Sequence, residues 1–329
     1  MEEVRLGTIG SGKIVHQILD NVLRTEGIRL QSAYSRSKEK AEQLVKEYGG
    51  CSAYTDLSAM LADEAVNTVY IASPNLLHYE QAKAALLAGK NVICEKPFVT
   101  RAEQARELSA LARERHLVLA EAAPTTYLPN FRLLKEALPK IGRIRLVLSN
   151  YSQYSSRYDA VLRGEKPNIF NPEFAGGCLM DINFYNLLLN VVLFGTPKEA
   201  VYYPNIHPGL ADTSGVLLFK YDDFLSENAG AKDADGVNFF QIEGEKGYIY
   251  VENGSNGLAA LRVVTKDGEE KLNDQPDPDR WFYEVQEMTR LLLADDYAAF
   301  DARLDRTVEA VALTESVRLA AGLRFPGDR

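Results

Sequence analysis

Asp181 and Tyr185 are the two residues whose types and spacing best suit acid–base chemistry in this chain. They stand four apart after Gly176-Gly177, so a helix there would place both on one face, from which they could project into the same cleft. A tyrosine acts as an acid or base when a nearby cation lowers the pKa of its hydroxyl from about 10. Lys96, which follows the apolar run NVIC, could be that cation. The alternative is that Tyr185 is a core aromatic, because the run LLLNVVLF beside it is strongly apolar.

A glycine-rich turn lies near the start of the chain, in the segment VRLGTIGSGKIVHQIL. Its spacing satisfies the opening of a phosphate-binding P-loop, but Ile14 stands where such a loop needs Ser or Thr to hold Mg²⁺. Dinucleotide binding fits better, because Gly10 and Gly12 allow a sharp turn and a close approach to a pyrophosphate at the next helix N terminus. Val15 occupies the third glycine position, so a plain strand-to-helix turn stays open as an alternative.

Other candidate cofactor residues follow further strand-like runs. Lys96 would lie at the carboxyl end of its strand, where ligands bind in open α/β sheets, although a solvated lysine is the alternative. Asn75 is predicted to contact the nicotinamide half or to cap a helix, and His78 to be packed or to cap a helix rather than to catalyse. The predicted cofactor-binding residues are Gly10, Ser11, Gly12, Lys13, Ile14, Ser35, Arg36, Ser73, Pro74, Asn75, His78, Glu95 and Lys96.

The tip of the second strand bears on the choice of cofactor. An acidic residue there binds the ribose 2′-hydroxyl of NAD and repels a 2′-phosphate. This chain has Ser35 and Arg36 instead. Both can donate to a phosphate, and Arg36 can also stack on adenine. The residues therefore favour NADP, with NAD as the alternative.

Alternating strand-like and helical patterns must position these residues. From residue 1 to 120, short apolar runs alternate with helical segments, which is typical of a parallel, doubly wound sheet. The segment EAAPTTYLPN indicates a crossing between domains. We predict an α/β fold, with a dinucleotide-binding domain over 1–122 and a second α/β domain over 123–329. Closely spaced strand-like runs in the second domain predict an open, mostly antiparallel or mixed sheet, and the linker DQPDPD precedes two final helices.

Composition narrows the class of protein. With 329 residues, 46% hydrophobic and 25% charged, the chain is typical of a globular protein of two domains. Its net charge of −9, without a long basic run, argues against nucleic acid as a partner. Three cysteines without a C-x-x-C and four scattered histidines indicate neither a metal site nor a disulfide framework. We expect a cytoplasmic protein with no membrane partner, because no signal peptide or long apolar span is evident.

Four motifs in order resemble the Gfo/Idh/MocA oxidoreductases, the family of glucose-fructose oxidoreductase and inositol dehydrogenase. They are the glycine turn, S-P-N-x-x-H at 73–78, E-K-P at 95–97 and G-G-x-x-x-D-x-x-x-Y at 176–185. The resemblance extends over nearly the whole chain. It implies an N-terminal Rossmann domain and a C-terminal α/β domain whose open sheet commonly forms an oligomer interface, so we expect a homodimer or a homotetramer.

The resemblance also implies roles for single residues. Lys96 matches the family's active-site lysine, and Asp181 matches the motif aspartate. Tyr185 stands where many members have histidine, although the glucose-fructose oxidoreductase and dimeric dihydrodiol dehydrogenase branches resemble this chain in having tyrosine. Asn183 and Val15 both replace a usual glycine.

These observations together predict hydride transfer between a nicotinamide and a sugar, polyol or related small carbonyl or hydroxyl compound. Tyr185 would be the acid or base, Lys96 would bind the reacting oxygen, and Asp181 would orient them. The predicted substrate-binding residues are Lys96, Tyr154, Arg157, Asn168, Asp181 and Tyr185. Two alternatives remain: a glycosidase or lyase of the same fold that keeps NAD tightly bound and oxidises its substrate transiently, and a non-catalytic NAD(P)-binding sensor.

Overall fold

The computed structural model describes residues 1–328, which pack as two compact units. The first unit comprises Met1–Ala123 and Asp279–Val308, and the second comprises Pro124–Pro278 and the residues from Glu309 on. The last two helices therefore begin within the first unit, although they follow the second in sequence.

The first unit is built on a six-stranded parallel sheet with the order β3-β2-β1-β4-β5-β6. This order reverses between β1 and β4, which is the switch point at which doubly wound sheets bind ligands. The sheet confirms the predicted parallel, doubly wound fold. The strands are β1 (Val4–Ile9), β2 (Ile28–Tyr34), β3 (Ser52–Tyr54), β4 (Thr68–Ile71), β5 (Asn91–Glu95) and β6 (Leu119–Ala122).

The helices of this unit begin and end where local side chains favour it. The Ser37 hydroxyl accepts a hydrogen bond from Lys40 N at the start of α2, and Gly49 ends that helix at φ +69°, a value that favours glycine. Gly89, at φ +76°, follows α4. Glycine is typical of both positions because it adopts a positive φ without a steric penalty. The helices are α1 (Lys13–Val22), α2 (Lys38–Tyr48), α3 (Leu57–Ala62), α4 (His78–Leu87), α5 (Ala102–Glu114) and α10 (Arg280–Leu293).

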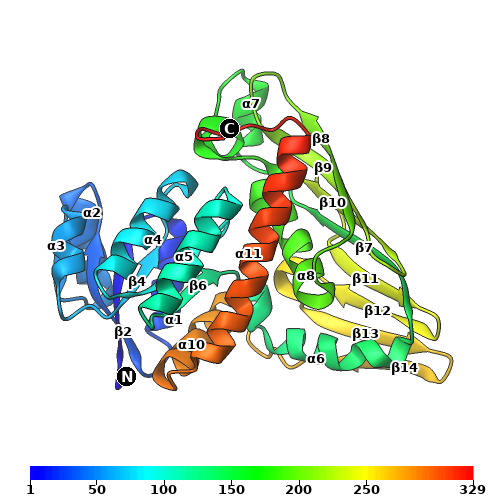
Figure 1. The fold of residues 1–329 in the computed structure, drawn as a ribbon, viewed down its shortest axis with the longest axis horizontal. Coiled ribbons are helices and arrows are strands. Elements are labelled where there is room, and N and C mark those ends of the chain that lie inside the picture. The colour runs from blue at the N-terminus through cyan, green and yellow to red at the C-terminus, as the bar shows by residue number, and fades with distance from the viewer. Residues whose placement is uncertain (329) are drawn as a thin grey trace. The chain divides into compact units, whose positions relative to one another are not determined.

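The second unit contains an eight-stranded sheet with the order β14-β13-β12-β11-β7-β10-β9-β8. Within this second sheet, only the β7–β10 pairing is parallel among the strands that the structure describes. This confirms the predicted mixed sheet. Helices α6 and α8 lie on one of its faces (Figure 1). The strands are β7 (Ile144–Ser152), β8 (Glu199–Ile206), β9 (Asp212–Lys220), β10 (Leu225–Ala231), β11 (Phe239–Gly244), β12 (Gly247–Glu252), β13 (Ala260–Thr265) and β14 (Gly268–Leu272).

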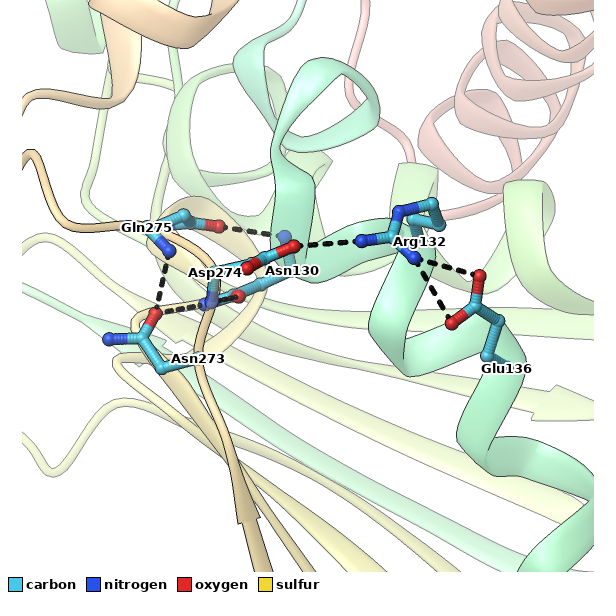
Figure 2. Close-up of polar contacts among 6 residues, drawn as sticks. All are labelled: Asn130, Arg132, Glu136, Asn273, Asp274 and Gln275. Carbon is cyan, nitrogen blue, oxygen red and sulfur yellow. Dashed lines mark hydrogen bonds and ion pairs between the residues drawn. The ribbon is translucent and has the colours of Figure 1, made fainter.

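Asn130 fixes the start of α6 to the linker that leads into α10. Its side-chain amide donates to the carbonyl of Leu258 at 2.7 Å and to Asn273 Oδ1 at 2.9 Å. In return its side-chain Oδ1 accepts from Asp274 N, and its backbone N–H donates to the side chain of Gln275 (Figure 2). The helices of this unit are α6 (Pro129–Ala137), α7 (Tyr158–Leu162), α8 (Phe184–Phe194) and α9 (Gly254–Gly257), with the end of α11 (Tyr297–Ala320).

The segment 172–194 is the one stretch of the described chain that is long and apolar enough to cross a membrane. However, 78% of its apolar window is buried inside the protein. Most of this window is therefore packed inside the second unit, where helix α8 contacts β7 and β10.

Candidate active site

The glycine turn after β1 packs directly against the end of β4. Gly10 has φ +117°, and a Cβ atom on it would lie 2.5 Å from the carbonyl oxygen of Ala72, so only glycine fits there. Its N–H donates to the carbonyl of Tyr34 at the end of β2, at 3.1 Å. The structure thus brings together the ends of β1, β2 and β4, as the sequence predicts.

The N terminus of α1 has an open approach. Gly12 is its N-cap and provides no side-chain cap, and a Cβ atom on Gly12 would meet nothing within 4 Å. The first N–H groups of a helix have no intrahelical acceptor and attract anions. This end, with exposed Lys13 beside it, therefore suits a pyrophosphate. Val15 is fully buried, so the third motif position serves packing between the helix and the sheet.

The tip of β2 carries donors for a phosphate. The Ser35 hydroxyl lies 3.4 Å from that of Ser11 and accepts from Ser37 N at 3.2 Å, which holds it next to the glycine turn. Arg36 is exposed. The glycine cradle and these donors together fit a dinucleotide.

His78 ties together the segments that follow β4 and β5. It is 1% exposed, with Nε2 at 2.9 Å from the carbonyl oxygen of Ser73 and Nδ1 at 3.1 Å from that of Pro97. Burial lowers its pKa. The ring thus holds Ser73 and the Lys96–Pro97 segment in place, in keeping with the predicted packed histidine.

Lys96 follows a strand end that is held by carboxylates. Glu95 Oε1 accepts from the hydroxyl of Tyr70 at 2.6 Å, and its Oε2 accepts from Lys96 N at 3.3 Å. Glu121, on β6, accepts from Phe98 N at 3.0 Å. Burial raises the pKa of Glu121 to about 7. The backbone on both sides of Lys96 is therefore fixed from within the first unit.

In the second unit, two glycines allow the chain to enter the segment that carries Asp181. A Cβ atom on Gly176 would lie 2.6 Å from the carbonyl oxygen of Ile169, and one on Gly177, at φ +128°, would collide with Asp212. The Leu179 N–H donates to Asp212 Oδ2 at 2.7 Å. Asp212 is fully buried, and its pKa is raised to about 6 by that burial.

The helix that contains Asp181 is wider than predicted at this point. Leu179–Asn183 forms a π-helix before the α-helix α8 begins at Phe184. Single π turns within α-helices are rare and are frequent at functional sites. Asp181 therefore lies on the π turn and Tyr185 on the first turn of α8, which changes the regular spacing expected of the pair.

Lys232 is a site residue that sequence reasoning missed. Its ammonium forms an ion pair with Asp181 Oδ2, and its side chain is only 5% exposed, whereas that of Asp181 is 28% exposed. Lys232 lies in the polar stretch AKDADG, directly after β10. No motif or periodicity marks it, since its partner is 51 residues away in sequence.

Tyr185 lies in a small core cluster with Tyr151, Cys178 and Ile182. It is 4% exposed, and its ring meets that of Tyr151 edge-on at 5.9 Å. The hydroxyl of Tyr151 in turn accepts a hydrogen bond from Asn256 Nδ2. The ring is packed as the core-aromatic alternative expects, and its acid–base role stays a proposal.

Asn183, the departure from the family pattern on the same helix, is accommodated by a glycine on β10. A Cβ atom on Gly230 would lie 2.7 Å from Asn183 Cβ. Asn183 is fully buried, its amide lies 3.3 Å from the carbonyl oxygen of Asn228, and its Oδ1 accepts from Asn186 Nδ2 at 3.0 Å. These contacts fix α8 to the sheet.

Three of the six predicted substrate residues, Tyr154, Arg157 and Asn168, lie in the loops before Gly176. Tyr154 donates through its hydroxyl to Asp159 at 2.7 Å, while Arg157 and Asn168 are exposed. All three belong to the second unit with Asp181 and Tyr185, whereas Lys96 belongs to the first.

Comparisons with known proteins identify the family. Residues 4–122 match the GFO_IDH_MocA family, an oxidoreductase family with an NAD-binding Rossmann fold. The chain is 36% identical over 325 residues to the uncharacterized oxidoreductase YgjR of Escherichia coli K12, with 99% of this chain and 98% of the relative covered. The chain belongs to the Gfo/Idh/MocA oxidoreductase family. As a member, it is an NAD(P)-dependent oxidoreductase.

This Gfo/Idh/MocA oxidoreductase is also similar to proteins of defined activity. It is 34% identical over 327 residues to scyllo-inositol 2-dehydrogenase (NADP(+)) IolU of Bacillus subtilis, covering 99% of both chains. A crystal structure of a 3-ketoreductase from Actinomadura kijaniata in complex with NADP and TDP-benzene superposes with a TM-score of 0.84 at 22% identity, over 96% of this chain and 97% of that one. At that identity the likeness shows the shared fold.

Proposed function

We propose that this enzyme transfers a hydride between the nicotinamide of NADP and a carbinol or carbonyl carbon of a sugar or polyol. The observation that carries this proposal is the full-length similarity to the NADP(+)-dependent scyllo-inositol 2-dehydrogenase. Another relative, 26% identical over 88% of this chain, is a D-xylose 1-dehydrogenase (NADP(+)). Both names describe oxidation of a cyclic polyhydroxy compound, which defines the substrate class proposed here.

The tip of β2 supports NADP rather than NAD. Ser35 and exposed Arg36 provide donors where an NAD enzyme would present an acidic side chain. The guanidinium of Arg36 can bind a phosphate through two parallel hydrogen bonds. We therefore expect the 2′-phosphate of NADP to contact Arg36, while NAD remains a usable cofactor.

The proposed chemistry assigns one role to each of three residues. The nicotinamide, when bound, accepts or supplies the hydride. Tyr185 takes the proton of the substrate hydroxyl during oxidation and returns it during reduction. The Lys96 ammonium binds the same oxygen and stabilises the negative charge that develops on it. Asp181 orients the reacting groups through hydrogen bonding and charge.

The proposal also assigns further substrate contacts, an oligomer interface and a cellular compartment. Tyr154, Arg157 and Asn168 are proposed to contact further hydroxyls of the substrate. The sheet face opposite α8 is proposed to form the interface of a homodimer or homotetramer, and the enzyme is proposed to act in the cytoplasm.

The function can be tested by a screen of aldoses, ketoses, inositols and dihydrodiols with NADP and with NAD. Absorbance of the reduced nicotinamide would be followed in both directions. We expect steady turnover of at least one of these compounds and a higher kcat/KM with NADP. A glycosidase or lyase that retains its NAD would instead co-purify with cofactor and show no net reduction, and a sensor would bind the cofactor without turnover.

A further inference from the structure

Lys232 is a buried cation whose backbone is fixed on both sides. Its N–H donates to the carbonyl of Thr213 at 2.8 Å, and its carbonyl oxygen accepts from Ser155 N at 2.9 Å. These bonds extend the end of β10 onto β9 and onto the loop that carries Tyr154 and Arg157. The backbone from which the Lys232 side chain extends is therefore held by the sheet.

The surroundings of the ammonium are apolar on one side and acidic on the other. It lies 5.8 Å from the centre of the Phe170 ring and pairs with Asp181 Oδ2. Burial of an ammonium is costly unless it is paired. The pair thus favours an ionised Asp181, and the 28% exposure of the Asp181 side chain leaves part of it accessible to a ligand.

Other titratable groups face the same place. They include the carboxylates of Asp212 and Asp233 and the thiol of Cys178. Burial raises the pKa of this thiol well above its ordinary value, and the charge of Lys232 offsets part of that rise. Asp212 accepts from the hydroxyl of Tyr202 at 2.6 Å, and Asp233 accepts from Thr213 at 2.7 Å. These two carboxylates therefore have donors of their own, whereas Lys232 is the cation paired with Asp181. Loss of Lys232 would remove the positive charge that is paired with Asp181.

We propose that Lys232 is a positioning residue of the active site, which holds Asp181 ionised and fixed on the π turn so that it can orient the substrate. This inference rests on the proposed function, because it assigns Asp181 a part in substrate binding. It also limits that part: an aspartate paired in this way accepts hydrogen bonds and does not act as the proton donor.

The variants Lys232→Met and Lys232→Arg test the proposal. Asp181→Asn and the double variant Lys232→Met/Asp181→Asn complete a double-mutant cycle with Lys232→Met. In Lys232→Met we expect kcat/KM at neutral pH to fall about 100-fold, as for a misplaced reacting group. Activity should recover partly at alkaline pH, because the loss of the cation raises the pKa of Asp181 and moves the acid limb of the pH profile upward. Lys232→Arg should keep the wild-type profile.

A second readout is independent of turnover. The thermal midpoint of Lys232→Met should fall as the pH rises through the raised pKa of Asp181, because a group with a raised folded-state pKa stabilises the fold only at low pH. The double variant removes both charges, so it should lack this fall and should be no less active than Asp181→Asn alone. The double variant also keeps the proposal testable if Lys232→Met alone does not fold.

The outcomes separate the two proposals. Wild-type pH profiles and midpoints for Lys232→Met would overturn the role of Lys232, while the proposed function would stand if Asp181→Asn is impaired. The role of Lys232 would also be contradicted if Lys232→Met lost both the wild-type pH profile of activity and the wild-type thermal midpoints, while neither Lys232→Arg nor the double variant restored them. If no sugar or polyol is turned over by the wild type, the proposed function fails, and the thermal midpoints still decide whether Lys232 controls Asp181.

Discussion

Glu121 is the residue whose ionisation should most clearly affect the stability of the first unit. It is 4% exposed and accepts hydrogen bonds from Phe98 N and from the hydroxyl of Thr307. Burial nonetheless dominates and raises its pKa to about 7 from the ordinary 4.5. Because the folded state holds this proton more tightly than the unfolded chain, Glu121 favours folding at low pH. That contribution is lost as the pH rises through 7.

We predict that Glu121→Gln flattens the dependence of stability on pH. The shift corresponds to about 3 kcal/mol of stability lost between pH 4.5 and pH 7, and glutamine removes the ionisation while keeping an acceptor for Phe98 N. Burial also raises the pKa of Glu95 and Glu284, so part of the slope should remain. Thermal midpoints of both proteins from pH 5 to pH 8 would show this, and parallel curves would contradict it.

Lys96 and Lys232 differ in how much of their role the sequence reveals. Lys96 could be predicted because an apolar strand run and Pro97 mark its position at a strand end. Lys232 and Asp212 could not, because their importance comes from Asp181 and Leu179, which contact them only after the sheet has formed. A long-range ion pair has no local pattern, and its members resemble solvated surface residues in the sequence.

Among the elements, the turn from β1 into α1 separates what the fold needs from what the cofactor needs. Gly10 is required by the backbone, because its φ is positive and Ala72 leaves no room for a Cβ atom. Gly12 has open space around it, so the fold itself would tolerate a methyl group there. That open space lies where the pyrophosphate is proposed to approach.

We predict opposite phenotypes for two alanine variants of this turn. Gly12→Ala should lower the thermal midpoint by only a few degrees, since alanine is a weaker N-cap than glycine by about 1 kcal/mol, but it should weaken NADP binding at least tenfold. Gly10→Ala should lower the midpoint markedly, because strain and a close contact with backbone cannot relax. Cofactor titration and calorimetry would test both, and unchanged NADP affinity in Gly12→Ala would contradict the proposed cradle.

Most elements could be predicted from periodicity, and the exceptions have physical reasons. Strand β10 has the sequence LSENAGA, whose inward residues Ser226 and Asn228 are polar because they bond to each other and to Asn190 on α8. The hydrophobic alternation that marks a strand is therefore missing there. Strand β14, whose sequence is GEEKL, likewise consists mostly of charged residues and lacks that alternation.

At the scale of the whole molecule, the second unit leaves one face of its sheet without helices (Figure 1). Apolar side chains lie on that face: Val201, Tyr203, Leu218 and Leu225 are 42–62% exposed, and Val201 and Leu218 are cross-strand neighbours. A contiguous exposed apolar surface is typical of an interaction site. We therefore assign the proposed oligomer interface to this face.

We predict that Leu218→Lys dissociates the proposed oligomer. In the oligomer, a lysine at this position would bring one positive charge from each subunit into an interface without water. Burying such a charge is unfavourable unless an opposite charge pairs with it. The matched control is Leu162→Lys, because Leu162 is 64% exposed on α7 outside the sheet. Light scattering after gel filtration should show a smaller species only for Leu218→Lys. A monomeric wild type would refute the interface.

The most direct test of the proposed catalysis is the kcat of Tyr185→Phe with NADP and the best substrate of the screen. Tyr151→Phe is its matched control, because the two rings touch in one core cluster and only Tyr185 is assigned the proton transfer. Lys96→Ala completes the set. We predict that Tyr185→Phe and Lys96→Ala each lower kcat by about 100-fold or more, with NADP affinity retained, while Tyr151→Phe stays close to wild type. Wild-type kcat in both Tyr185→Phe and Lys96→Ala would contradict the assignment.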